Sequence, residues 1–129
     1  MKIEIDIPAE RIANLMISAM ESGDPVTTAA RGGWCQEIRR TSRKPFTGTW
    51  WYADPKYFEG QFSFKVGEFD EDNDSVSWHR VNRQRVADGL RTMARDFPHL
   101  FAQIIEDNTD APCADIFLQC IVFGEEKYA

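Results

Sequence analysis

The pattern of apolar and polar residues changes its period several times along the chain. Residues Met1–Ile7 alternate, with isoleucine at every second position, and this alternation predicts a β-strand. From Ala9 to about Met20 the apolar positions recur every three or four residues, which predicts an amphipathic helix. Pro8 suits the first turn of that helix, because its missing N–H would have no partner there.

The central part of the chain predicts a β-meander. Trp34–Arg40 and Thr47–Tyr52 have the composition of short strands. Gln61–Phe69 alternates clearly between apolar and polar residues, and Ser75–Val81 returns as a strand after the polar turn Asp70–Asp74. We therefore expect three to four antiparallel strands with one buried face.

The last third of the chain has the period of helices. Asn82 is a favourable N-cap for the first of them. Four apolar residues then follow at steps of four, three and four, which marks one helical face. They are Val86, Leu90, Met93 and Phe97. Pro98 either kinks this helix or starts a second one, and the apolar period continues to about Asp107.

Ala111–Phe123 is expected to form the last helix. Pro112 falls in its first turn and Gly124 just beyond its end, which is the usual asymmetry of helix ends. Apolar residues cover most of its circumference, and such a helix is buried on several sides. It is therefore either the central helix of the domain or in contact with a second subunit, which leaves a homodimer open.

The order of these elements predicts the fold class. A strand and a helix come first, then a block of strands, then two to three helices. Such blocks are typical of an α+β domain whose helices pack on one face of an antiparallel sheet. With 129 residues, the chain fits a single domain over residues 1–129.

Composition narrows the function. The chain carries 15 Lys and Arg against 21 Asp and Glu, a formal net charge of −6. An acidic chain is not expected to bind nucleic acid generally, because such proteins usually carry a strongly basic face. The N-terminus lacks the pattern of a signal peptide, and the longest nearly uncharged apolar run, Ile116–Gly124, is too short to span a bilayer. We expect a cytoplasmic protein without a membrane partner.

The cysteines and histidines show no recognisable site. Cys35, Cys113 and Cys120 lack the paired spacing of a disulfide framework or a zinc site. We assign no catalytic residue, metal or cofactor, and expect a protein that is not an enzyme. Cys35 follows Gly32-Gly33-Trp34, and an exposed loop there would keep a thiol enzyme as a third hypothesis.

The last third of the chain contains the pattern Asp110-Ala111, Ala114–Gln119, Phe123-Gly124-Glu125 and Tyr128. In this pattern it resembles a family of small proteins encoded by bacteriophages, prophages and plasmids. Gly89-Leu90, Met93, Phe97-Pro98 and Phe101 extend the resemblance, as do the first strand and helix. The family has no known catalytic residues, so the resemblance implies only a mobile element as genomic context. By analogy with other small acidic proteins of such elements, it suggests an anti-CRISPR or anti-restriction role.

The acidic turn consists of Asp70, Glu71, Asp72, Asn73 and Asp74. Counting Asp70 as the first position of a calcium loop places Ser75 where a glycine is needed and Val81 where a glutamate is needed. We therefore predict a solvated hairpin tip, since turns favour Asp and Asn. A docking surface for a basic partner is the alternative.

Basic residues concentrate in two central stretches, close in sequence to tryptophans. The candidates for an anion site or nucleic-acid site are Arg39, Arg40, Arg43, Lys44, Arg80 and Arg83. Basic residues interleaved with aromatic ones can bind phosphates and stack bases. The alternatives are a solvated helix face and a protein-docking surface.

Trp50-Trp51-Tyr52 is the most unusual local feature. In a strand, Trp50 and Tyr52 would face one side of the sheet and Trp51 the other. If one side is core, the other exposes a large aromatic ring, as interfaces do. Burial of both sides beneath helices is an equal alternative.

These observations lead to one leading hypothesis and one alternative. The leading hypothesis is a mobile-element protein without enzymatic activity that binds and inhibits a host defence protein, such as a CRISPR effector. Its contacts would come from Asp70, Glu71, Asp72 and Asp74 and from the aromatic triplet Trp50, Trp51 and Tyr52. The alternative is a nucleotide- or nucleic-acid-binding module that uses arginines and tryptophans, although the net charge makes it the weaker choice.

Overall fold

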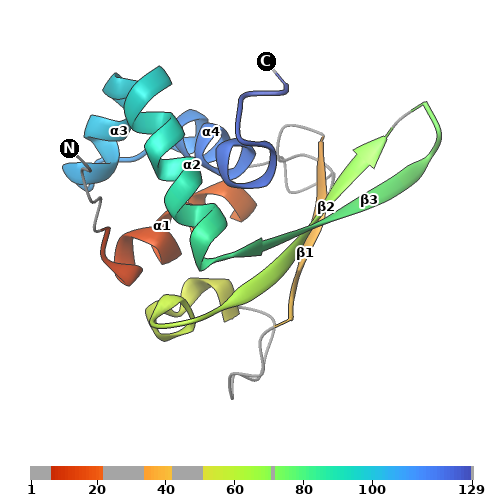
Figure 1. The fold of residues 1–129 in the computed structure, drawn as a ribbon, viewed down its shortest axis with the longest axis horizontal. Helices are drawn as coiled ribbons and strands as arrows, with labels where there is room; N and C mark the ends of the chain where they lie inside the picture. Colours follow the sequence, from red (N-terminus) through yellow and green to blue (C-terminus); the bar gives the residue numbers. More distant parts are fainter. Residues whose placement is uncertain (1–6, 22–33, 42–50, 71, 129) are drawn as a thin grey trace.

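A computed structural model describes residues 7–21, 34–41, 51–70 and 72–128. The strand expected over Met1–Ile7 lies outside these ranges except for Ile7. The described part is an α+β fold with a three-stranded sheet on one side and helices on the other (Figure 1). The predicted fold class is therefore confirmed. Within the described ranges, no helix combines the length and apolarity needed to cross a bilayer.

The sheet is an antiparallel meander in the order β1-β2-β3. Its strands are β1 (Cys35–Arg40), β2 (Ser63–Asp70) and β3 (Ser75–Asn82). The side chains of Phe64, Val66 and Val81 point toward the helices and are fully buried. This face is called the inner face below, and the opposite one the outer face. The hairpin between β2 and β3 extends well beyond the helices (Figure 1).

Four helices of the described ranges lie on the other side of the molecule. They are α1 (Ala9–Glu21), α2 (Arg83–Asp96), α3 (Pro98–Ile105) and α4 (Ala111–Phe123). The side chain of Asn82 accepts a hydrogen bond from the backbone of Arg85 and caps α2, as the sequence predicts. Pro98 starts a separate helix and does not merely kink α2. Gly124 ends α4 with a φ of 76°.

The central position of α4 explains its apolar circumference. It packs against α1, α2 and β3, and its residues from Ile116 to Val122 are all buried. The contact with α2 is close at Gly89, where an added Cβ would lie 2.6 Å from Cγ2 and 2.9 Å from Cα of Ile121. The chain itself thus covers α4, which needs no second subunit for its burial.

The segment before β2 differs from the sequence prediction. Trp51–Ala53 forms a 3₁₀ turn, η1, followed by a second one, η2 (Pro55–Phe58). The strand expected over Thr47–Tyr52 is therefore wrong for Trp51 and Tyr52, and its other residues lie outside the described ranges. The turn directs both rings into the core, where the Trp51 ring lies 4.6 Å from that of Tyr57 and 5.7 Å from that of Phe64.

The end of the chain is tied to α4 and the sheet. The side-chain oxygen of Gln119 accepts hydrogen bonds from the backbone N–H groups of Lys127 and Tyr128, and its amide donates to the carbonyl of Tyr128. The Tyr128 ring stacks on that of Trp34, whose Nε1 donates to Asp115 at 3.0 Å. Because Gln119 is fully buried, these bonds satisfy an amide that could not reach water.

Glu68 on the inner face completes this cluster. Its carboxylate accepts hydrogen bonds from Lys127 Nζ at 2.6 Å and from the Tyr128 hydroxyl, and it lies 2.9 Å from Nε2 of His79. Desolvation opposes ionisation of Glu68, but these hydrogen bonds and the charge of Lys127 prevail. They lower the pKa of Glu68 from 4.5 to about 2.

Candidate nucleic-acid interface

The outer face of the sheet carries a row of basic residues. The strand register places Arg39 of β1 beside Lys65 of β2, and Lys65 beside Arg80 of β3. All three are exposed. Because paired residues in antiparallel strands share one face, their side chains rise from the same side of the sheet. With strands about 4.8 Å apart, the row spans about 10 Å.

An exposed tryptophan lies next to this row. Trp78 pairs with Gly67 of β2, and 37% of its surface is accessible. A Cβ at Gly67 would lie only 3.2 Å from two carbons of the Trp78 ring. The indole therefore extends across the neighbouring strand over Gly67, which leaves room for it because it has no side chain. Val76, 36% exposed, adds an aliphatic side chain to the same face.

Arg39 connects the basic row with the tryptophan. Its guanidinium carbon lies 4.5 Å from the centroid of the Trp78 ring, which is a cation–π contact. Its Nη2 donates to a carboxylate oxygen of Glu37 at 2.7 Å. Both side chains are well exposed, so a phosphate could replace Glu37 as the acceptor without breaking into the core.

This arrangement suits a flexible anionic chain with planar groups. An aromatic ring can stack a base of any identity, while nearby arginines and lysines contact the phosphates. Arginine also offers a bidentate fork to a phosphate and a flat surface to a ring. The outer face combines these groups within two strand spacings, although the protein as a whole is acidic.

The other predicted basic residues do not join this surface. Arg40 pairs with Phe64 and so projects from the opposite side of the sheet to Arg39. Arg43 and Lys44 lie outside the described residues. The side chain of Arg83 turns away toward α1 and η2, where it donates to the carbonyls of Gly60 at 3.0 Å and Phe58 at 3.4 Å.

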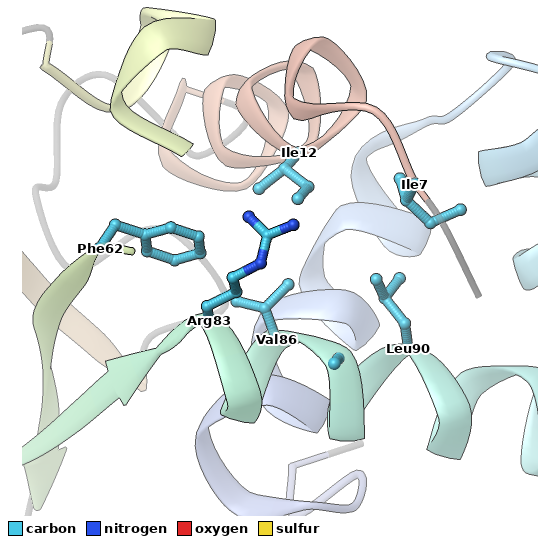
Figure 2. A pocket seen from close by; sticks show the side chains of 7 residues that line it. Ile7, Ile12, Phe62, Arg83, Val86 and Leu90 are labelled. Atoms are coloured by element: carbon cyan, nitrogen blue, oxygen red, sulfur yellow. The ribbon is translucent and has the colours of Figure 1, made fainter. Parts of the chain in front are cut away.

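Arg83 instead lines a small pocket between α1 and α2. Figure 2 shows its guanidinium between Phe62, Ile12 and Val86, with Leu90 and Ile7 farther along the same wall. The pocket has a volume of about 60 Å³. The other side chains that line the pocket are apolar, and Arg83 is bonded to the carbonyls of Phe58 and Gly60, so this arginine is a structural residue and no part of the basic row.

The acidic turn forms the tip of the β2–β3 hairpin, as predicted. Asp72, Asn73 and Asp74 are exposed, and Glu71 lies outside the described residues. The carboxylate of Asp70 accepts hydrogen bonds from the side chain of Asn73 at 2.7 Å and from the backbone of Asp72 at 3.0 Å. The bond from Asn73 is the main cause of the lowered pKa of Asp70. Asp70 thus shapes the turn, whereas Asp72 and Asp74 remain available to a partner.

Two further sequence candidates are buried. Trp51 and Tyr52 are 7% and 8% exposed, so they form no open aromatic surface, and Trp50 lies outside the described residues. Cys35 is fully buried at the start of β1, so the exposed thiol on which the third hypothesis depended is not present there. Burial raises the pKa of Cys113 to about 11 and that of Cys120 to about 12, which makes both thiols inert near neutral pH.

No metal centre is found in the part of the chain that the structure describes. There, no three residues among His, Cys, Asp and Glu are arranged to hold an ion. Comparisons with protein-family models, with curated proteins and with solved structures found no match to this chain.

Lys65 and Gly67 were not among the predicted site residues, although the sequence contains a pattern that places them. The acidic turn fixes the hairpin, and pairing Asp70 with Ser75 sets the register of both strands. Counting back from this pair places Gly67 opposite Trp78 and Lys65 opposite Arg80. Arg39 was a candidate by composition, but its position beside Lys65 cannot be counted in this way, because β1 ends at Arg40 and β2 begins only at Ser63.

Proposed function

We propose that the protein binds single-stranded nucleic acid on the outer face of its sheet. The observation that carries the proposal is the exposed Trp78 ring beside the row Arg39, Lys65 and Arg80. One base would stack on this ring or on the Arg39 guanidinium that lies over it. The backbone phosphates of the strand would contact the three cations.

The net charge of −6 affects which nucleic acids the protein would bind. The acidic remainder of the surface repels a duplex, whereas three clustered cations attract a flexible strand locally. Three phosphate contacts correspond to a slope of about −2 in a plot of log affinity against log salt for a single strand. We therefore expect moderate affinity for a single strand, with a shallow dependence of that affinity on salt. The protein would meet such strands in the host cytoplasm.

Fluorescence anisotropy with a labelled single-stranded oligonucleotide tests the proposal. Trp78→Ala should weaken binding by about tenfold, because stacking on an aromatic ring contributes about 1–3 kcal/mol per base. Ile105→Ala is the matched control, since Ile105 is an exposed apolar residue of α3, 49% accessible and outside the sheet. Equal affinities of the two variants would overturn the proposal.

Two double variants, each of which removes two positive charges, test the basic row. Lys65→Ala combined with Arg80→Ala should lower affinity and reduce the salt slope by about 1.4. The control is Arg91→Ala combined with Arg95→Ala, which removes the same charge from exposed positions of α2. If both double variants lose affinity equally, the attraction is a property of the net charge and not of the outer face.

The projecting hairpin favours a second function, inhibition of a host defence protein. The hairpin extends from the body of the molecule and presents Asp72 and Asp74 at its tip (Figure 1). An acidic projection of this kind fits a basic groove, such as the nucleic-acid channel of a CRISPR effector or another nuclease. The resemblance to proteins of mobile elements supplies the context for such a target.

This second function is tested by association kinetics with a purified nuclease complex. Asp72→Asn combined with Asp74→Asn should slow association, most clearly at low salt, because steering depends on charge. Asn also tolerates the left-handed φ of 47° at position 74. Glu106→Gln together with Asp107→Asn is the control, removing two exposed charges from the end of α3. Unchanged kinetics in the tip variant would exclude this role for the hairpin.

A further inference from the structure

The backbone hydrogen bonds show which groups of β3 face away from the sheet. Phe69 N–H donates to the carbonyl of Trp34, and the carbonyl of Ser63 accepts from Thr41 N–H. The backbone N–H and C=O groups of the odd-numbered residues of β2 therefore point toward β1. Those of its even-numbered residues point toward β3. In an antiparallel ladder, hydrogen-bonded and non-hydrogen-bonded pairs alternate.

The other edge of β3 is consequently unpaired within the described part of the chain. The partners of the even-numbered β2 residues are the odd-numbered residues of β3, from Ser75 to Val81. The backbone N–H and C=O groups of Val76, Trp78 and Arg80 thus point outward, and none of them has a partner among the described residues. An eight-residue edge without proline and with exposed apolar side chains is a template for another strand.

We propose that β3 pairs antiparallel with β3 of a second copy of this chain, around a two-fold axis at Ser77. In this register Ser77 faces its own counterpart, Trp78 faces Val76, and Arg80 faces Asp74 of the second copy. Each contact occurs twice, as two-fold symmetry requires. The pairing continues the sheet from three strands to six, with both outer faces on the same side.

Charge determines the direction of the pairing. β3 begins beside the acidic residues Asp72 and Asp74 and carries Arg80 near its other end. Antiparallel pairing brings the acidic start of one strand to the basic end of the other, whereas parallel pairing would bring like charges together.

The side chains determine the register. Two neighbouring registers arise when one strand shifts by two residues in either direction. One places Trp78 opposite Trp78 of the second copy, and the other places Trp78 opposite Asp74. The Ser77 register alone among these three combines the apolar pair Trp78–Val76 with the opposite charges of Arg80 and Asp74. All three registers align the outward-pointing backbone groups of the two strands, as a ladder needs, so the side chains alone distinguish them.

Pairing through β3 does not depend on the proposed nucleic-acid binding, and the two can occur together. Pairing uses the edge of β3 and leaves the outer face open. The six-stranded sheet would carry two Trp78 rings and two basic rows side by side, which would roughly double the length of strand it can hold. The test below measures mass and crosslinking, so it succeeds or fails independently of nucleic-acid binding.

Cysteine crosslinking tests the register. Two Ser77 residues at the axis form a non-hydrogen-bonded pair with Cα atoms about 4.5 Å apart, within the range of a disulfide. Ser77→Cys should therefore give a disulfide-linked dimer under mild oxidation. Ser75→Cys is the matched control: Ser75 is also exposed, but the two copies of this residue would lie about 13 Å apart. The three native cysteines are buried and should add little background.

Sedimentation equilibrium of the unmodified protein provides the second readout. We expect a concentration-dependent rise from 14.8 kDa to twice that mass. Arg80→Glu should shift this rise to higher concentration, because it places Glu opposite Asp74 and leaves the hydrogen bonds between β2 and β3 intact. Faster crosslinking of Ser77→Cys than of Ser75→Cys, together with the dimer mass, supports the proposal. Equal crosslinking rates, or a mass that stays monomeric, overturn it.

Discussion

The two faces of β2 hold their charged residues in different ways. On the inner face, Glu68 is 8% exposed and contacts Lys127, Tyr128 and His79. On the outer face, Lys65 is exposed between Arg39 and Arg80. The same strand thus carries one charge that is fully engaged within the chain and one that is available to a partner.

This difference separates residues that maintain the fold from residues that can bind. A buried carboxylate is stable only with hydrogen bonds and an opposite charge, so the chain supplies both to Glu68. An exposed cation needs neither, because water solvates it. We therefore expect substitutions toward the inner side to change stability, and substitutions on the outer face to change binding.

Gly89→Ala should have the largest effect, because it lies in the packed interior. Its Cβ would come within 2.6 Å of Ile121 Cγ2 and 2.9 Å of the Ile121 backbone, so α2 and α4 must move apart. We expect a loss of about 3 kcal/mol in the free energy of unfolding, measured by urea denaturation. A loss below that of Gly67→Ala would contradict the close contact between these helices.

Glu68→Gln should have the second largest effect and a distinct pH dependence. The depressed pKa of Glu68, about 2 against 4.5, corresponds to about 3 kcal/mol of stability at neutral pH. This contribution is present above pH 4.5 and is lost as the pH falls toward 2. The difference in unfolding free energy between the variant and the unmodified protein should therefore narrow over that range.

Glu37→Gln is the matched control for this experiment, since Glu37 is a carboxylate of the outer face, 46% exposed. Its loss should change the unfolding free energy by less than about 0.5 kcal/mol at neutral pH. A difference between Glu68→Gln and the unmodified protein that stays constant from pH 7 to pH 2 would show that packing, and not ionisation, accounts for the role of Glu68.

Gly67→Ala should have a smaller effect, because its neighbours are exposed side chains. The new Cβ would lie 2.9 Å from Val76 Cγ1 and 3.2 Å from the Trp78 ring, and both can shift into solvent. We expect a loss of about 1 kcal/mol in stability. Near-ultraviolet circular dichroism should report the displaced indole, and oligonucleotide affinity should fall as well. An unchanged spectrum would contradict the position of the Trp78 ring over Gly67.

Lys65→Ala should have the smallest effect on stability, below about 0.5 kcal/mol, since Lys65 is exposed and its charge forms no ion pair with another described residue. Its oligonucleotide affinity should nevertheless fall. A loss of stability comparable to that of Glu68→Gln would remove the contrast between the two faces of β2.

Periodicity and caps predicted most of the elements correctly. The stripe Val86, Leu90 and Met93 is buried as expected, and Asn82 and Gly124 mark helix ends. Local signals suffice there, because a helix depends on residues three and four apart. The prediction failed at Trp51 and Tyr52, where aromatic composition favoured a strand but Asp54-Pro55 and the core favour 3₁₀ turns. Their burial also removes Trp51 and Tyr52 from the candidate interface.

By itself, the sequence determined the α+β order, the helix ends and the hairpin at Asp70–Asp74, because each depends on neighbours within a few residues. Only the tertiary structure decided which charges are engaged and which are open. Arg39, Lys65 and Arg80 come from three strands and meet through register, while Arg40 and Arg83 project elsewhere. The contact between Glu68 and Tyr128 joins residues 60 positions apart. Such pairs depend on how the sheet and helices pack, and no local pattern contains that information.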